Sequence, residues 1–166
     1  MPDLTITRMF DAPRELVFAA WTDPDQLASW LGPHGYTGAA VTLATRPGGA
    51  WRACIRSPEG DEHKRFRGSG WRSPRLGAKP RTTLMHGVYR EIAAPERLVF
   101  TFAWDTEGDL REETLVTIGF ADLDGKTEMT FVQTGFPTAA DRDGHDAGWT
   151  ASFEDLTGFI RGKDAR

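Results

Sequence analysis

The sequence predicts an α+β fold in which one curved antiparallel sheet wraps around a long C-terminal helix. Three observations support this prediction. The middle of the chain is a series of strand-like segments separated by turn signals, which is typical of an antiparallel meander. The C-terminal part carries one apolar stripe at helical spacing. The chain also holds six Trp and ten Phe residues, and so many large rings need either a large core or a lined cavity.

The first elements that we expect are one strand and two short helices. Leu4–Phe10 alternates loosely between apolar and polar residues, which predicts a strand. Asp11–Pro13 is expected to open a helix, with Asp11 as its cap and Pro13 in its first turn. Asp23–Gln26 has the spacing of a second capping signal. We expect the second helix to end at Gly32–Pro33.

Six further strands are expected in the middle of the chain. Gly and Pro residues mark the turns between them, and Asp124–Gly125 is a strong signal for a two-residue hairpin. A large antiparallel sheet twists and curls, so one of its faces becomes concave. The six segments run from Val41 to Thr45, Trp51 to Ile55, Met85 to Ile92, Leu98 to Trp104, Glu113 to Phe120 and Lys126 to Thr134.

The last element is expected to be the long helix. Thr138–Asp141 has the spacing of a capping box at its start. Trp149, Phe153, Leu156 and Ile160 then recur at intervals of three or four residues, which places them on one stripe. The expected order is therefore one strand, two helices, six strands and one helix (β-αα-β6-α). This helix carries the only long apolar stripe that can cover the concave face of the sheet.

Length and composition fit a single domain that spans residues 1–166. The net charge of -4 argues against a nucleic-acid partner for the whole domain. No apolar run approaches the ~18 residues of a membrane span, and the N-terminus does not resemble a secretory signal. Cys54 is the single cysteine, so no intramolecular disulfide can form. We therefore expect a cytoplasmic protein that does not bind membranes.

Residues 64–82 differ from the rest of the chain. They contain seven of the 20 basic residues and no acidic residue, which leaves 13 basic against 24 acidic residues elsewhere, a net charge of -11. Gly and Pro residues interrupt any regular element in this basic loop. One interpretation is a flap that touches an anionic ligand, a nucleic acid or an acidic partner. The simpler interpretation is a solvated, disordered loop whose charge balances an acidic body.

Several short motifs, in a fixed order, resemble those of a known superfamily. They are Asp11–Phe18, Trp21–Pro24, Trp30–Pro33, Gly87–Ile92, Pro95–Phe102, Glu113–Ile118 and Gly148–Trp149. Together they resemble the SRPBCC superfamily, whose members are START-like and similar to the birch-pollen allergen. Within it, the chain is most similar to homologues of the activator of the heat-shock-protein-90 ATPase, C-terminal domain type.

The resemblance covers nearly the whole chain and implies a helix-grip fold with a cavity between the sheet and the long helix. It implies little about chemistry, because members range from lipid carriers to cyclases. Residues 64–82 depart from the pattern and look like an insertion, so no family role can be transferred to them. The eukaryotic activator has a second domain for its chaperone work, and nothing in this sequence matches that domain.

The candidate ligand-binding residues are mostly aromatic side chains on the elements that should face one another. Such rings can surround an apolar ligand, and a few polar groups among them can orient a carbonyl or a hydroxyl. The simpler interpretation is that the rings only fill the core and that the polar groups are satisfied there. The candidates are Trp30, Trp51, Tyr89, Phe100, Phe102, Trp104, Phe131, Gln133, Trp149 and Phe153.

Catalysis is an alternative, with His145, His86 and Glu113 as candidate proton-transfer groups. His145 is the first candidate because it precedes Trp149 by four residues and shares its helix face. No spacing in the sequence pairs a particular histidine with a carboxylate. The histidines and Cys54 show no metal-ligand spacing, and no glycine-rich segment has the pattern of a phosphate loop. We therefore expect neither a metal nor another cofactor.

Three functions follow from these observations. The first is binding of a small hydrophobic or amphipathic ligand in the cavity between sheet and C-terminal helix. The second is an enzyme of the cyclase, dehydratase or hydrolase type that acts on a small apolar substrate in that cavity. The third is a chaperone-associated interaction protein, and this hypothesis depends on family analogy alone. A homodimer is compatible with the sequence on general grounds.

Overall fold

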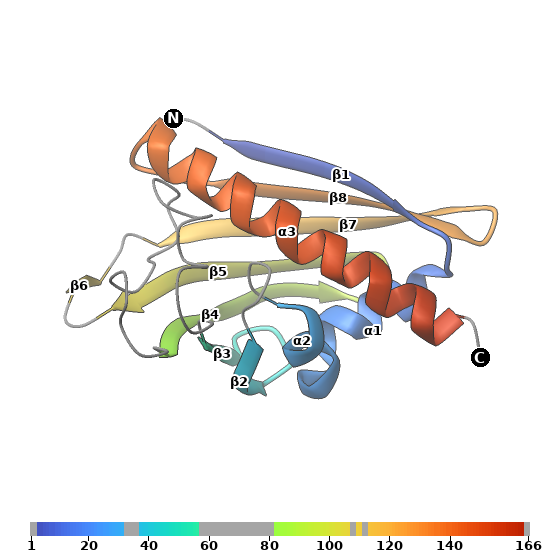
Figure 1. The fold of residues 1–166 in the computed structure, drawn as a ribbon, viewed down its shortest axis with the longest axis horizontal. Helices are drawn as coiled ribbons and strands as arrows, with labels where there is room; N and C mark the ends of the chain where they lie inside the picture. The colour runs from blue at the N-terminus through green and yellow to red at the C-terminus, as the bar shows by residue number, and fades with distance from the viewer. Residues whose placement is uncertain (1–2, 32–36, 57–81, 107–108, 111–112, 165–166) are drawn as a thin grey trace.

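The computed structural model describes residues 3–31, 37–56, 82–106, 109–110 and 113–164. It has the predicted α+β architecture (Figure 1). One antiparallel sheet forms a layer, and helix α3 (Ala139–Asp164) lies across one face of it. Two short helices, α1 (Arg14–Thr22) and α2 (Pro24–Trp30), lie near the C-terminal part of α3 (Figure 1). The helix-grip prediction is therefore confirmed.

The sheet follows the order β1-β8-β7-β5-β4-β3-β2, and every neighbouring pair is antiparallel. The strands from β2 onward form the predicted meander, and β1 then pairs with β8. The strands are β1 (Leu4–Phe10), β2 (Thr37–Leu43), β3 (Ala50–Arg56), β4 (Thr82–Ala93), β5 (Arg97–Thr106), β6 (Asp109–Leu110), β7 (Thr114–Leu123) and β8 (Lys126–Thr134).

The short strand β6 is the one element that the sequence analysis did not predict. It has only two residues, and they pair with Asp105 and Thr106 of β5. Asp105 also pairs with Leu84 of β4, so β6 must lie on the other edge of β5. Further along the chain β7 pairs with β5 as well. A two-residue strand carries no periodicity from which it could have been recognised.

The hairpin between β7 and β8 has the predicted two-residue turn. Asp124 and Gly125 both have positive φ angles, 54° and 86°. This combination matches the right-handed twist of the strands on either side. The Asp122 carboxylate also accepts a hydrogen bond from the Gly125 amide at 3.1 Å. Strand β7 extends to Leu123, three residues beyond the predicted end, because the turn joins the two strands directly.

Two helix starts illustrate where capping signals succeed and fail. The prediction that Asp11 caps α1 is wrong: Pro13 is the cap residue, in an extended conformation, and no side chain accepts a hydrogen bond there. The prediction for α2 is confirmed, because the Asp23 carboxylate accepts hydrogen bonds from the Asp25 and Gln26 amides. Helix α2 already ends at Trp30, before Gly32–Pro33, which lies outside the described residues.

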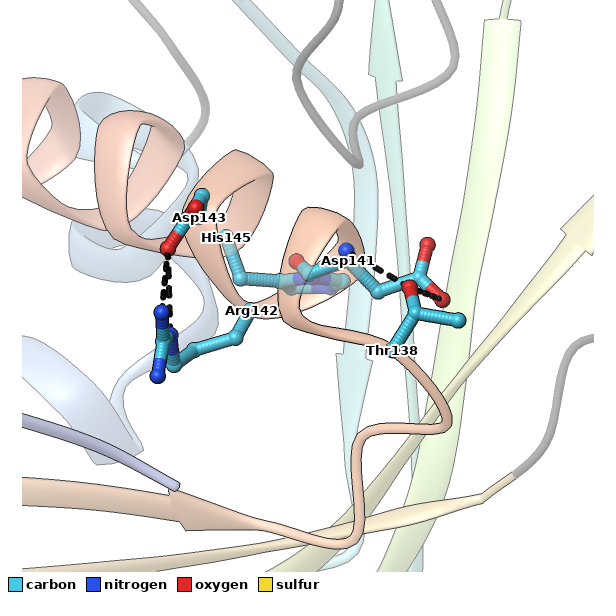
Figure 2. Close-up of polar contacts among 5 residues, drawn as sticks. All are labelled: Thr138, Asp141, Arg142, Asp143 and His145. Atoms are coloured by element: carbon cyan, nitrogen blue, oxygen red, sulfur yellow. Dashed lines mark hydrogen bonds and ion pairs between the residues drawn. The ribbon is translucent and has the colours of Figure 1, made fainter. Parts of the chain in front are cut away.

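Helix α3 begins and packs as predicted. The Asp141 amide donates to the Thr138 hydroxyl oxygen at 3.1 Å, and that hydroxyl lies 3.0 Å from the Asp141 carboxylate (Figure 2). The stripe formed by Trp149, Phe153 and Leu156 is at most 1% exposed. It packs into a core shared with the inner face of the sheet.

One sequence prediction, the basic loop, lies almost entirely outside the described residues. Residues 64–81 of the basic loop are not described, and Thr82, its last predicted residue, instead begins β4. None of the helices in the described ranges is long and apolar enough to span a membrane.

Candidate functional site

The centre of the core is an aromatic cluster around Trp21 of α1. The Trp21 ring lies 4.7 Å from that of Trp30, centroid to centroid, and 6.0 Å from that of Phe153. It also stacks on Phe131 of β8 at 6.3 Å. Trp149 approaches the same cluster from α3, 4.8 Å from Phe131. Aromatic rings from the two short helices, from α3 and from the sheet therefore pack together in one cluster.

An apolar cavity lies next to this cluster. Its volume is about 20 Å³, which is room for roughly one water molecule. Leu43 of β2 is the only half-buried residue among those that line it. The lining residues are Trp21, Leu27, Leu31, Leu43, Trp51, Met85, Tyr89, Leu98, Phe100, Phe102 and Trp149.

Half of the predicted ligand-binding residues line this cavity, namely Trp51, Tyr89, Phe100, Phe102 and Trp149. The other five are buried in the same core without bordering the cavity; they are Trp30, Trp104, Phe131, Gln133 and Phe153.

Sequence reasoning missed the wall that the two short helices supply. Trp21, Leu27 and Leu31 come from α1, from α2 and from its C-terminal cap. The helical spacing of these apolar residues is a visible signal that they face the core. Trp30 is the only residue of the two short helices among the sequence-predicted ligand-binding residues, because the C-terminal helix carries the only long apolar stripe that could cover the sheet.

A buried chain of hydrogen bonds fixes α3 to the sheet. The Trp149 indole donates to Oε1 of Gln133 at 2.9 Å, and Nε2 of Gln133 donates to the Thr114 hydroxyl at 2.8 Å. The Thr114 hydroxyl in turn donates to the carbonyl of Phe102 at 3.1 Å. Gln133 is fully buried. Its amide is therefore engaged in holding Trp149 at the edge of the cavity.

The position of Trp51 depends on the glycine opposite to it. Trp51 of β3 pairs with Gly87 of β4, and its indole reaches across to donate to the Thr101 carbonyl of β5 at 2.9 Å. A Cβ atom on Gly87 would lie 1.8 Å from that carbonyl oxygen and 2.5 Å from the indole nitrogen. Only glycine leaves room for this contact, which holds the Trp51 ring in the cavity wall.

Tyr89 is the one phenol in the cavity wall. The residue is 3% exposed, and its ring packs edge-on against Phe100 at 6.2 Å. Burial raises the pKa of the Tyr89 hydroxyl well above its ordinary value, because the ionised form would lose its hydration. Tyr89 is therefore a neutral group that can donate or accept one hydrogen bond.

His145, the first candidate for catalysis, is held by hydrogen bonds on both ring nitrogens. The Trp104 indole donates to its Nε2 at 2.9 Å, and its Nδ1 lies 3.0 Å from the carbonyl of Asp141, one turn earlier in α3 (Figure 2). An indole N–H can only donate, so Nε2 accepts and the proton is assigned to Nδ1. In this arrangement His145 links α3 to β5.

His86 and Glu113, the other two candidates, lie away from the cavity. His86 is half-buried and follows the inward-facing Met85 along β4, so it belongs to the outer face of the sheet. Glu113 is exposed and borders an open groove on that outer face beside Arg90 and Leu115. Neither residue lines the cavity. Among the described residues, no cluster of three acidic, His or Cys side chains could hold a metal ion.

An antiparallel sheet gripping a long C-terminal helix, with two short helices and an apolar cavity beneath, defines a protein of the helix-grip fold. The family model described as "Activator of Hsp90 ATPase homolog 1-like protein" matches residues 11–161. The chain belongs to that family.

Solved structures show the same fold over nearly the whole chain. A Chromobacterium violaceum protein is 26% identical, with a TM-score of 0.75 and coverage of 95% of this chain and 96% of its own. The AHSA1 protein of Silicibacter pomeroyi is 20% identical, with a TM-score of 0.76 and coverage of 98% and 99%. An AHSA1-like protein of Aeromonas hydrophila is 17% identical, with a TM-score of 0.70 and coverage of 99% and 96%. None of the curated proteins matches the chain significantly.

Proposed function

We propose that the protein binds a small hydrophobic or amphipathic ligand in the cavity between the sheet, the two short helices and α3. The observation that carries this proposal is the cavity wall, which consists of aliphatic and aromatic side chains and includes no charged residue. Ligand sites have this composition, with a few placed polar groups. The family supports the proposal, because a cavity between sheet and helix is the feature shared by SRPBCC proteins.

The cavity must widen to admit a ligand. Its present volume of about 20 Å³ suits one water molecule, whereas an organic ligand displaces several times more. Leu43 of β2 is the most exposed lining residue, and we propose that the ligand enters beside it. Movement of the Leu43 side chain would widen the cavity there. Rearrangements of this size on binding are common in proteins.

Binding is tested by titrating the protein with a panel of lipids, aromatic compounds and polyketides. Trp21, Trp51 and Trp149 line the cavity, so an occupant should change the tryptophan emission. A ligand present at about 100 times its Kd should add about 2.7 kcal/mol to the free energy of unfolding and raise the melting temperature. The proposal fails if no member of the panel changes either emission or melting temperature.

A bulky residue at the proposed entrance should block binding. Leu43→Trp places a larger side chain there, so we expect it to weaken every ligand that the wild-type protein binds by at least about tenfold. Leu123→Trp is the matched control, because Leu123 is 44% exposed at the β7–β8 hairpin, far along the sheet order from β2. Equal ligand affinities for the two variants would contradict entry beside Leu43.

The two alternative functions remain predictions without a supporting contact. The enzyme hypothesis depends first on His145, whose ring nitrogens are engaged with Trp104 and the Asp141 carbonyl. The hypothesis of a chaperone-associated protein depends on the family name alone. Ligand binding is the function that a described feature of the molecule favours.

A further inference from the structure

Among the described residues, the indole N–H of Trp21, which lines the cavity, is a buried hydrogen-bond donor without an acceptor. Four of the five tryptophans in the described part of the chain donate their indole N–H: Trp30 to the Ala20 carbonyl, Trp51 to the Thr101 carbonyl, Trp104 to His145 and Trp149 to Gln133. The indole nitrogen of Trp21 is fully buried and has no hydrogen-bond partner in the described part of the chain. Trp21 itself is 3% exposed and lines the cavity.

An unsatisfied buried donor is rare in a native structure and calls for an explanation. The other buried polar atom without a partner, Oε1 of Gln26, belongs to a half-buried side chain that does not line the cavity. A bound water is a poor partner for Trp21, because a buried water needs two to four polar contacts and this wall is almost entirely apolar. The donor is therefore suited to an acceptor that arrives with a ligand.

We propose that the Trp21 indole N–H is the recognition donor of the cavity and that the ligand is a neutral apolar molecule with one acceptor oxygen, such as a ketone, an aldehyde or an ester. This inference rests on the proposed function and adds the chemical class of the ligand. A carboxylate does not suit the site, because no cationic side chain lines the cavity and burying an unpaired charge is very unfavourable.

The surroundings of Trp21 support a fixed donor. Its ring is held by contacts with Trp30 at 4.7 Å, Trp149 at 6.0 Å and Phe100 at 6.3 Å. A donor that packing has already oriented loses little freedom when it meets its acceptor. Tyr89 also lines the cavity, and burial keeps its hydroxyl in the neutral form.

The test uses two probes of nearly the same shape, acetophenone and α-methylstyrene, in which a C=O group replaces a C=CH₂ group. Binding to the full-length protein is measured by calorimetry. We expect acetophenone to bind at least about tenfold more tightly than α-methylstyrene. In Trp21→Phe the ratio should fall to about one, through loss of acetophenone affinity. Trp30→Phe is the matched control, because the Trp30 indole already has its acceptor and does not line the cavity; there the preference should remain.

A second measurement is made on the wild-type protein and uses a variant only to assign one resonance. In wild-type protein with ¹⁵N-labelled tryptophan, acetophenone should shift one indole resonance downfield, the one that is absent from Trp21→Phe, and α-methylstyrene should not. If both probes bind with equal affinity and change that resonance to the same extent, the inference is wrong, but the proposed function stands. If neither probe binds, both are overturned for ligands of this size. A long-lived water found at the Trp21 N–H, with no preference for acetophenone, also overturns the inference.

Discussion

The buried polar side chains of this protein differ in whether their polar atoms have hydrogen-bond partners. Gln133 and Thr114 are buried polar residues, and their side chains form hydrogen bonds with other groups of the protein. Both ring nitrogens of His145 are likewise engaged within the protein, so His145 differs from a catalytic base that is accessible to a substrate. The Trp21 indole N–H, by contrast, has no acceptor among the described residues, and Trp21 lines the cavity. The polar groups that the sequence offers as a site are therefore mostly structural, and a residue it did not single out is the better candidate.

Gly87 is predicted to be more sensitive to substitution by alanine than Gly119, another glycine of the sheet. In Gly87→Ala the new methyl group would meet the Thr101 carbonyl oxygen at 1.8 Å and displace the Trp51 indole. Overpacking of this kind costs about 3 kcal/mol, so the free energy of unfolding in urea should fall by roughly that amount. Gly119→Ala is the control, because a Cβ there meets nothing within 4 Å. Equal stability of the two variants would show that the Trp51 contact is not constrained in this way.

Tyr89 should make the stability of the protein depend on alkaline pH. Because burial raises the pKa of the folded-state hydroxyl above its unfolded value of about 10, the unfolded chain releases the proton first. The stabilisation is thus complete below about pH 10, and it is lost as the pH rises above that value, by up to about 1.4 kcal/mol per pH unit. Tyr89→Phe removes this contribution, so wild-type protein should lose stability faster than the variant between pH 10 and pH 11. Parallel curves would show that the hydroxyl is hydrated in the folded protein.

The elements differ in how strongly local signals determine them. The Asp124–Gly125 turn and the Asp23 cap follow the sequence directly, because each depends on a few adjacent residues. The start of α1 does not, since Pro13 in an extended conformation begins that helix without help from Asp11. The orientation of α3 is determined by its apolar stripe. Trp149, Phe153 and Leu156 are all buried when this face of the helix packs against the sheet.

The cap of α3 provides a test of one local signal. In Thr138→Ala the Asp141 amide loses the hydroxyl oxygen that it contacts at 3.1 Å. The loss of such a cap typically costs about 1 kcal/mol, which urea denaturation can resolve. Thr138→Ser keeps the oxygen and should lie within a few tenths of a kcal/mol of the wild-type protein. If Ala and Ser are equally stable at this position, the cap does not contribute to the stability of the fold.

The sequence predicts the architecture of the chain far better than it predicts the site. Alternation and helical spacing identify the long elements, and packing a sheet against one apolar helix leaves few arrangements. The cavity depends on which rings leave a gap, and this is decided by details such as the absence of a Cβ at Gly87 and the approach of Leu27 and Leu31 from α2. The periodicity of apolar residues along the sequence predicts that a residue is buried. It does not predict whether that residue lines a cavity.

We propose that the space between the sheet, α1, α2 and α3 receives a small apolar ligand, and a crystal structure of the protein soaked with acetophenone is the decisive experiment. Electron density for the ligand is expected among Trp21, Trp51 and Leu43, with its carbonyl oxygen within hydrogen-bonding distance of the Trp21 indole nitrogen. Density confined to the outer face of the sheet, beside Arg90 and Leu115, or a core that stays filled at saturating ligand, would contradict it.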